Sequence, residues 1–544
     1  MSETSELFES AWCKDFKYYA RVYNPETKKS SQVEFDNHYE GFVRDPKGIW
    51  SCFTDPSIKL RKFHGRSKEM HGDAVFGVTP PIYRYIRDTF WKEHKYNLHP
   101  NVWYLDIETR ALSAPDPDNV PNEVVLIQIY DTFTNTEYVL GRKEWTPEPD
   151  YKIPVNVKYL CIPDEVQLLD TFLKLFSKLD PLIIYAWNGD GFDYPYLYNR
   201  IQKLGLDPNR MSNYGSAILD KNEKTLRKSW TLNANGHYYL DLMNVYKKYT
   251  FAPRASYSLE NIASVELGEH KIDHSEYLDF DSAYTGLNYE IKDEAINDRI
   301  REEIRQIRIS KGNDAINDFE YLKKVNFMFV YYGIQDVVLL KNIDEKLGFT
   351  NILLGIAQMM GVLASDSMGT VKPWAQYIAN MAYLDNKVLP PRKENPAPNI
   401  VGGFVREPVK GKQEWMCNLD YNSMYPMLSI SGHNMSPETY IPISKLPNDL
   451  KDYILRYFNN QNEQERLALS KEVWDNVTAL LKKYNCALAI NGAVFDKSHE
   501  GLIPRLVNEI YDNRKKDKKT MIKYESQKVK IGEILAKRGI NIHN

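Results

Sequence analysis

The stretch VWYLDIE, residues 102–108, decides how the rest of the chain is interpreted. Its first four residues are mostly apolar, and a short run of this kind predicts a buried strand. Side chains alternate between the faces of a strand, so Asp106 and Glu108 point one way while Ile107 points the other way. Two neighbouring carboxylates repel each other, and an oxygen-binding cation such as Mg²⁺ or Mn²⁺ removes that repulsion. A solvated strand end is the alternative, and this stretch alone leaves both open.

Length and composition predict a globular protein of several domains. The chain has 544 residues, of which 43% are hydrophobic and 26% charged. Its five cysteines are scattered without a CxxC pair, which favours a reducing compartment over disulfides or zinc. No signal peptide or long apolar span is found, so we expect a soluble, cytoplasmic protein without a membrane partner. The net charge of −3 means that any nucleic-acid surface must be local.

The segments that follow Glu108 predict an α/β arrangement. Residues 124–130 and 136–140 predict two more strands, which would form an antiparallel meander with the first. Residues 165–179 have the periodicity of an amphipathic helix, and residues 182–187 predict another buried strand. The whole chain is therefore expected to be α/β or, more broadly, a multi-domain α+β protein.

Three polar residues stand near these elements. Asp193 follows a strand and two glycines, where it is either a helix N-cap or a third metal carboxylate. Residues 325–340 predict a helix on which Tyr332 and Asp336 share one face. A single Tyr/Asp pair at this spacing is usually part of a solvated surface, so its meaning depends on the other motifs.

In this order the patterns Asp106-x-Glu108, Asn188-x-x-x-Phe192-Asp193 and Tyr332-x-x-x-Asp336 resemble the three motifs of proofreading 3′→5′ exonucleases of the DnaQ type. The resemblance implies an RNase H-like domain that degrades single-stranded DNA. It also implies two Mg²⁺ or Mn²⁺ ions held by the four acids, which activate water and stabilise the leaving oxygen. Tyr332 would position the attacking water or the scissile phosphate.

A second chemical centre is expected at residues 415–426, WMCNLDYNSMYP, where a predicted strand again ends in an acid. This segment resembles motif A of family B DNA polymerases, with two mild departures to methionine. The resemblance implies that Asp420 binds the catalytic metals and that Tyr421 and Tyr425 contact the incoming nucleotide, with Tyr425 beneath the deoxyribose. The alternative is a strand-to-helix turn in which Asp420 caps the helix.

The last predicted helix, residues 501–538, carries Arg514 and Lys518 one turn apart. It resembles the first fingers helix of the family, which grips the incoming triphosphate; a basic solvated helix is the alternative. The segment Ser436–Thr439, SPET, matches the T-even-type phage branch of the family. We expect the apolar stripe of the helix to be an uncovered interaction site, and it consists of Leu506, Val507, Ile510 and Tyr511.

Residues 421–544 contain neither the Lys-x-x-x-Asn-Ser-x-Tyr-Gly pattern nor the Asp-Thr-Asp-Ser pattern that follow motif A in the family. Two lookalikes, residues 213–215 and 279–282, precede motif A and lack the required lead-in. We therefore expect the N-terminal half of a split polymerase, whose second chain brings the remaining palm, the fingers and the thumb. Primer–template DNA, deoxynucleoside triphosphates and, through that second chain, a sliding clamp are the other expected partners, in the host cell cytoplasm.

Three alternatives remain open. In the first, the chain is a stand-alone exonuclease with a vestigial palm. In the second, it is a non-catalytic nucleic-acid-binding regulator, and in the third it is a truncated piece of a longer polymerase. The expected domains are an N-terminal domain at 1–100, the exonuclease at 101–348, a return segment that packs on the N-terminal domain and a linker at 349–390, the partial palm at 391–500, and the first fingers helix at 501–544.

Overall fold

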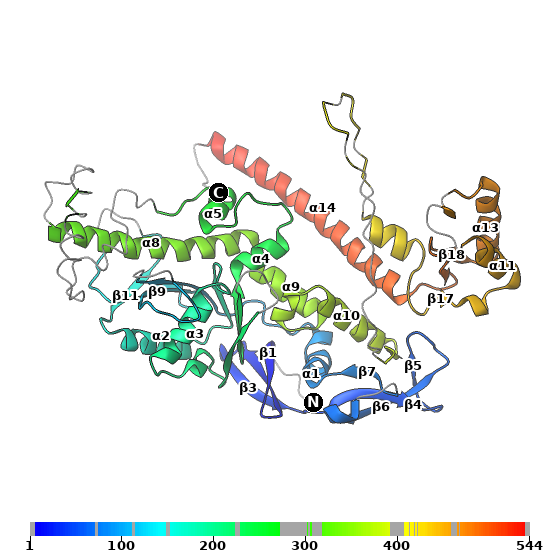
Figure 1. Cartoon of the computed structure of the whole chain (residues 1–544), viewed down its shortest axis with the longest axis horizontal. Helices are drawn as coiled ribbons and strands as arrows, with labels where there is room; N and C mark the ends of the chain where they lie inside the picture. The colour runs from blue at the N-terminus through cyan, green and yellow to red at the C-terminus, as the bar shows by residue number, and fades with distance from the viewer. Residues whose placement is uncertain are drawn as a thin grey trace. The chain divides into compact units, whose positions relative to one another are not determined.

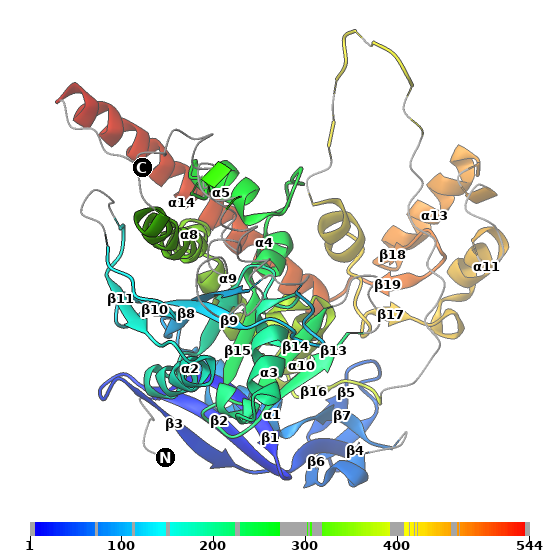
Figure 2. The ribbon, with the colours of Figure 1, turned by 60° about the vertical axis from the view of Figure 1, so that its left-hand side comes forward.

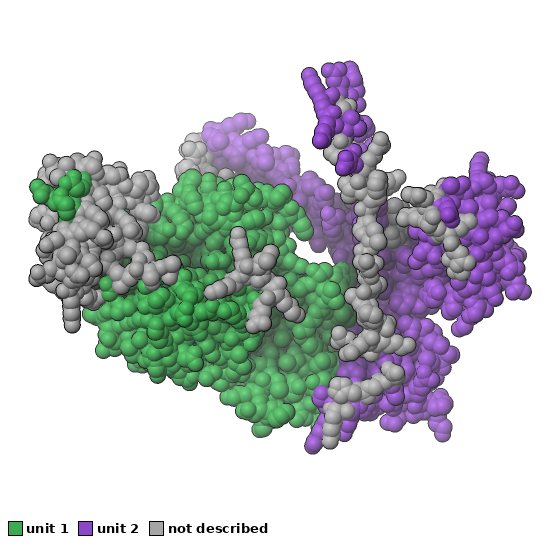
Figure 3. Space-filling model, viewed as in Figure 1, with its two compact units in different colours: residues 1–39, 79–377 green, residues 40–78, 378–544 purple. Residues whose placement is uncertain are grey.

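The structure, a computed structural model of the chain, divides into two compact units (Figure 3). Unit 1 consists of residues 1–39 and 79–377, and unit 2 of residues 40–78 and 378–544. Side chains are not described at 68, 318–325 and 428–429. All residues are otherwise described except 1–5, 71–73, 111–114, 148–152, 223–228, 273–301, 303–304, 307–317, 392–406, 408, 413, 418, 421–422, 459–464, 467 and 539–544.

The centre of unit 1 is an eight-stranded mixed sheet with the strand order β11-β10-β9-β8-β12-β15-β14-β13. Strands β8, β9 and β10 are antiparallel neighbours, which confirms the predicted meander. On its other side β8 is parallel to β12, which is parallel to β15. The strands are β8 (Val102–Thr109), β9 (Val124–Asp131), β10 (Thr136–Gly141), β11 (Val157–Cys161), β12 (Ile183–Ala186), β13 (Ala217–Lys221), β14 (Trp230–Ala234) and β15 (His237–Asp241).

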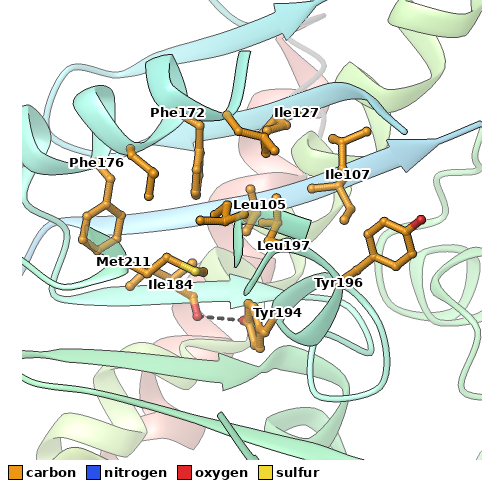
Figure 4. Packing of buried hydrophobic residues seen from close by; sticks show 14 of the residues in the cluster. Leu105, Ile107, Ile127, Phe172, Phe176, Ile184, Tyr194, Tyr196, Leu197 and Met211 are labelled. Carbon is orange, nitrogen blue, oxygen red and sulfur yellow. Dashed lines mark hydrogen bonds between the residues drawn. The ribbon is translucent and has the colours of Figure 1, made fainter. Parts of the chain in front are cut away.

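Helices lie on both faces of this sheet (Figure 1, Figure 2). On one face, α2 and α3 pack on Leu105, Ile107 and Ile127, which point into the cluster drawn in Figure 4. On the other face, Tyr104 and Tyr130 belong to a second core that includes α8. The helices of this unit are α1 (Pro81–Thr89), α2 (Glu165–Leu179), α3 (Asp193–Lys203), α4 (Leu242–Tyr249), α5 (Leu259–Leu267), α8 (Asp318–Leu347) and α9 (Phe349–Met360), with α10 (Val371–Leu384) continuing into unit 2.

An N-terminal antiparallel sheet, β1 (Leu7–Lys14), β2 (Lys17–Asn24) and β3 (Lys29–Phe35), is also part of unit 1. Its buried Arg21 pairs with Glu9 at 2.6 Å and donates to the backbone oxygen of Asp180 at 2.8 Å. A buried charge is tolerated only when it is paired and hydrogen-bonded. Arg21 therefore fixes the N-terminal sheet to the turn after α2 through its hydrogen bond to Asp180.

Unit 2 holds two small sheets, in the orders β16-β5-β6-β4-β7 and β17-β19-β18. Among the described residues of the whole chain, no helix is long and apolar enough to span a membrane. The strands and helices are β4 (Tyr39–Arg44), β5 (Trp50–Cys52), β6 (Lys59–Gly65), β7 (Phe76–Thr79), β16 (Lys387–Val388), β17 (Tyr440–Ile441), β18 (Cys486–Leu488), β19 (Val494–Asp496), the π-helix η5 (Tyr425–Ser431), α11 (Asn448–Tyr457), α13 (Lys471–Lys483) and α14 (Leu502–Lys537).

The strand predicted for residues 415–420 was wrong for the residues that the structure describes there. Residues 414–417 and 419–420 lie outside any strand, and the Trp415 side chain is fully exposed. An apolar run becomes a strand only when neighbouring strands satisfy its backbone groups and cover its side chains. None of the described strands pairs with this segment.

The prediction of an uncovered stripe at the start of α14 was also wrong. Leu506 is buried, and Val507, Ile510 and Tyr511 are partly buried. This end of α14 packs against η5 of the same unit. The exposed apolar residues of α14 lie further along the helix, and they are Met521, Ile522, Tyr524, Val529, Ile531 and Ile534.

Candidate active site

Asp106 and Glu108 project from β8 on the face opposite Leu105 and Ile107, as the alternation predicts. Both residues keep part of their surface exposed. Burial of its carboxyl is nevertheless the largest cause that raises the pKa of Asp106 well above its usual value. The negative charges of Glu108, Asp193 and Asp336 raise it further, and the charge of Lys271 lowers it. Asp106 therefore lies within electrostatic reach of the other three predicted acids.

Asp193 is the first residue of α3, and the cap position is occupied by Phe192, which makes no side-chain cap hydrogen bond. The helix is fixed to the sheet by Tyr194, whose hydroxyl donates to the backbone oxygen of Ile184 at 2.9 Å (Figure 4) and to that of Leu240 at 2.9 Å. Burial raises the pKa of Asp193 to about 7, although its own amide and that of Ile107 hydrogen-bond the carboxylate. The buried carboxyl is thus held next to β8.

The turn before α3 needs a close backbone approach at Gly189. A Cβ there would lie 2.6 Å from the ring of Tyr194, so a larger residue would displace the tyrosine that anchors the helix. The preceding Asn188 has a φ of 62°, which asparagine tolerates better than most residues. Asn188 and Gly189 therefore suit the turn that places Asp193 at the start of α3.

Tyr332 and Asp336 lie one turn apart on α8, and Asp336 is buried. Burial raises the pKa of Asp336 to about 6, and Lys271 opposes this rise. The pKa of Tyr332 is raised to about 12 by burial and by the charges of Asp336 and Glu108. The charge of Glu108 reaches Tyr332 and that of Asp336 reaches Asp106, so α8 and β8 face one common site.

Lys271 is a member of this site that the sequence interpretation missed. Its Nζ donates to Asp336 Oδ2 at 2.6 Å and to the Tyr332 hydroxyl at 2.9 Å. Its pKa is raised because the attraction of Asp336 and Tyr332 outweighs the effect of burial. A single lysine in a polar segment has no pattern that distinguishes it, so local sequence offered no signal.

The donor atoms of the site suit a divalent cation, since all four acids offer carboxylate oxygens. Oδ1 of Asp336 is buried and has no hydrogen-bond partner among the described residues. As they stand, however, no three Asp, Glu, His or Cys side chains of the described residues converge closely enough to hold a metal. The Lys271 ammonium lies 2.6 Å from Oδ2 of Asp336 and neutralises that carboxylate.

The candidate polymerase residues lie in unit 2. Asp420 is exposed, Tyr425 in η5 is 71% exposed, and Tyr421 lies outside the described residues. Arg514 and Lys518 are both exposed on α14, one turn apart. The structure therefore leaves the four described candidates accessible to a ligand.

The SPET segment and Asn434, two residues before it, hold the start of α14. Glu438 Oε1 accepts the backbone N–H of Leu502 at 2.6 Å, and Asn434 Oδ1 accepts that of Gly501 at 2.9 Å. The first N–H groups of a helix have no intrahelical partner, so these side chains satisfy them. The segment thereby fixes the start of α14, the helix that presents Arg514 and Lys518.

Comparison with known proteins gives two matches to one family. The family described as "DNA polymerase family B, exonuclease domain" matches residues 82–262, and that described as "DNA polymerase family B" matches residues 375–538. A DNA-directed DNA polymerase of Escherichia phage RB69 is 24% identical over 463 residues, covering 80% of this chain and 44% of its own length. The DNA-directed DNA polymerase of Enterobacteria phage T4 is 25% identical over 507 residues, which cover 89% of this chain and 49% of the T4 protein. A DNA polymerase of Pyrococcus glycovorans is 24% identical over 294 residues, covering 52% and 32%.

Both matches point to one class of protein, a family of DNA polymerases with an exonuclease domain. The chain belongs to the family B DNA polymerases, and its mixed α/β, multi-domain structure is consistent with the RNase H-like exonuclease fold. It spans about half the length of the phage relatives it matches. Asp106, Glu108 and Asp193 lie inside the matched exonuclease range, whereas Lys271 and α8 lie beyond it. The contribution of α8 therefore rests on the geometry described above.

Proposed function

We propose that unit 1 hydrolyses single-stranded DNA from its 3′ end, and that Asp106, Glu108, Asp193 and Asp336 carry this reaction. The supporting observation is electrostatic: the charges of the other three acids raise the pKa of Asp106. Such mutual repulsion is a cost that a protein retains where function requires it. Membership of the family B exonucleases supports the same proposal.

The four acids would hold Mg²⁺ or Mn²⁺ ions, two per site. When bound, such ions activate a water molecule and stabilise the leaving oxygen of a phosphodiester. The acids come from β8, α3 and α8, so the sheet and both helices must be in place before the ligands can converge. The ammonium of Lys271 must leave Oδ2 of Asp336 for this oxygen to become a ligand.

Tyr332 would position the attacking water or the scissile phosphate. Its hydroxyl already accepts a hydrogen bond from Lys271 at 2.9 Å, which orients it toward the carboxylates. The Tyr332 hydroxyl is protonated at neutral pH, since its pKa is raised from 10.0 to about 12, so it can donate to a phosphate oxygen. Lys271 brings a positive charge to the same point, which suits an anionic substrate.

We further propose that unit 2 carries part of a DNA-directed DNA polymerase site. Asp420 would bind the catalytic Mg²⁺ or Mn²⁺ ions, Tyr421 and Tyr425 would contact the nucleotide, and Arg514 and Lys518 would grip the triphosphate of the incoming deoxynucleotide. The match of residues 375–538 to the family supports this assignment. Metals in phosphoryl transfer are held from several sides, so one carboxylate does not suffice for nucleotide addition.

In this proposal a second polypeptide completes the palm, fingers and thumb, binds the primer–template with this chain, and contacts the sliding clamp. The exposure of Trp415, Met416 and Leu419, which lie next to Asp420, supports it. Large exposed apolar groups mark an interaction site. The earlier domain limits, 1–100, 101–348, 349–390, 391–500 and 501–544, remain a proposal about how these tasks divide along the chain.

One experiment separates this proposal from its alternatives. The chain is assayed alone and with the candidate second polypeptide, for degradation of 5′-labelled single-stranded DNA and for primer extension, while light scattering gives the stoichiometry. We expect nuclease activity from the chain alone, and primer extension only from a 1:1 complex. Extension by this chain alone would overturn the split site. Nuclease activity without association would favour a stand-alone exonuclease, and binding without either activity a regulator.

A further inference from the structure

Gln128 of β9 is a buried amide beside the carboxylate site. Its side chain is 0% exposed, and neither Oε1 nor Nε2 has a hydrogen-bond partner among the described residues. It interrupts the apolar run of residues 124–130 in β9, in which the neighbouring Ile127 points into the core of Figure 4. Because side chains alternate along a strand, Gln128 points to the opposite face, where Asp106 and Glu108 also lie.

The register of the sheet makes Gln128 the direct neighbour of Asp106. The two residues are Cα partners across the antiparallel pair β8–β9. Such partners have their Cβ atoms about 4.5–5.5 Å apart, a distance that a glutamine side chain spans. On its other side Gln128 faces Val139 of β10, which offers no polar side-chain atom. Of the two residues that pair directly with Gln128, Asp106 is therefore the polar one.

Helix α8 covers the amide at a glycine. A Cβ on Gly333 would lie 1.7 Å from Nε2 and 2.4 Å from Cδ of Gln128. The amide therefore lies against the backbone of α8 immediately after Tyr332 and one turn before Asp336. Gln128 therefore lies next to β8, its partner strand, and against α8. These two elements together supply most of the proposed site.

A buried amide without a hydrogen-bond partner destabilises the folded protein, and an apolar residue of similar shape would remove this cost. A glutamine at this position is thus explained if its amide has a hydrogen-bond partner in the active enzyme. We propose that Gln128 is a positioning residue of the exonuclease, and that its Nε2–H donates to a carboxylate oxygen of Asp106 and holds that carboxylate toward the metal. This inference rests on the proposed exonuclease function.

The principal test is Gln128→Met, which keeps the length of the side chain and removes the hydrogen bond. Partners that orient metal ligands typically contribute about 10–100-fold to metal affinity or activity. We expect kcat on single-stranded DNA to fall, and the Mn²⁺ concentration for half-saturation to rise, by factors in that range. The Mn²⁺ value is measured by calorimetry without DNA. KM for DNA and the melting temperature in EDTA should not fall, and Gln202→Met, at an exposed position on α3, is the matched control.

A second pair of variants keeps the test valid if Gln128→Met folds poorly. Gly333→Ala adds the methyl group that collides with the amide, so it should reproduce the loss of Mn²⁺ affinity. In Gln128→Ala the collision partner is gone, so adding Gly333→Ala should cause no further loss. Additive losses in the double variant would contradict the proposal, as would Mn²⁺ affinity and kcat unchanged within twofold in Gln128→Met.

The outcome also separates this inference from the function on which it rests. If Asp106→Ala with Glu108→Ala abolishes nuclease activity and Gln128→Met leaves it unchanged, only the positioning role fails. If the double acid variant retains full activity in a clean preparation, the exonuclease assignment and the positioning role fall together.

Discussion

The Nζ atom of Lys271 lies 2.6 Å from Oδ2 of Asp336, and it joins the segment after α5 to helix α8. Asp336 is buried, and its charge acts on Asp106 across the site. The ammonium thus compensates part of the negative charge that the carboxylates concentrate. The Lys271 ammonium is therefore a cation of the protein itself at a place where the proposed function requires a metal ion from solution.

Replacement of Lys271 by methionine should therefore impair the exonuclease. Loss of the ammonium removes an interaction that lowers the pKa of Asp336, so the pH at which activity reaches half its maximum should rise. Loss of a charged donor at the reacting phosphate should lower kcat by about 100-fold. Lys248→Met, which loses only an exposed hydrogen bond to Thr370, is the control for a general charge effect. An unshifted pH profile with normal kcat would contradict this role for Lys271.

The double variant Asp106→Ala with Glu108→Ala should have no detectable nuclease activity and should keep its fold. The two acids project from the same face of β8, and their removal relieves repulsion that raises the pKa of Asp106. Hydrolysis of 5′-labelled single-stranded DNA with Mg²⁺ or Mn²⁺ measures the activity, and thermal unfolding in EDTA measures the stability. A melting temperature well below that of the wild type would indicate a structural role instead.

The metal-free protein should lose stability as the pH rises from about 4 to about 7. The pKa of Asp193 is raised from 3.8 to about 7 by burial, so the unfolded chain releases this proton first. The unfolded state is then favoured as the pH increases, and the loss is complete above the folded pKa. Thermal unfolding in EDTA of the wild type and of Asp193→Asn, which cannot ionise, measures this effect.

Between pH about 4 and about 7, the melting temperature of Asp193→Asn should rise relative to that of the wild type. Addition of Mg²⁺ or Mn²⁺ at pH about 7 should recover stability for the wild type only, because metal ions bind the ionised carboxylate. A difference that does not vary with pH would show that Asp193 titrates normally in the folded protein.

Tyr425→Ala should reduce the preference of the assembled polymerase for deoxynucleotides. Removal of a bulky ring beneath the sugar makes room for a 2′-hydroxyl, and steric discrimination of this size is worth about 10–200-fold. Incorporation of matched deoxy- and ribonucleotides by the complex with the second polypeptide measures the ratio, with Tyr440→Ala, on β17, as the control. An unchanged ratio would exclude Tyr425 as the residue that senses the sugar.

The elements that the sequence predicted best are those whose apolar residues pack on strands or helices nearby in the sequence. Helix α2 has the predicted bounds, Glu165–Leu179, because its apolar stripe faces a sheet built from nearby strands. Residues 415–420 show the opposite case, since an apolar run indicates a strand but does not supply the strands beside it. The start of α14 was misjudged because the contact with η5 joins segments distant in sequence.

The candidate site was predictable to the extent that its residues form motifs. Asp106 and Glu108 mark a strand, but Lys271 is 65 residues from Asp336 and belongs to no pattern. Gln128 was detectable in principle, since a glutamine inside the run VVLIQIY is an evident exception to burial. The property that distinguishes it, a buried amide without a partner among the described residues, requires coordinates.

The pairing of β16 with β5 has a consequence for any attempt to divide the chain. The two residues of β16, Lys387–Val388, extend a sheet whose other strands all come from the first 80 residues. A fragment that begins at residue 378 would leave β16 without its neighbour, and a fragment that ends at 377 would expose the backbone edge of β5 to other chains. Each unit is built from two separate stretches of the chain, so neither unit can be excised by a single cut.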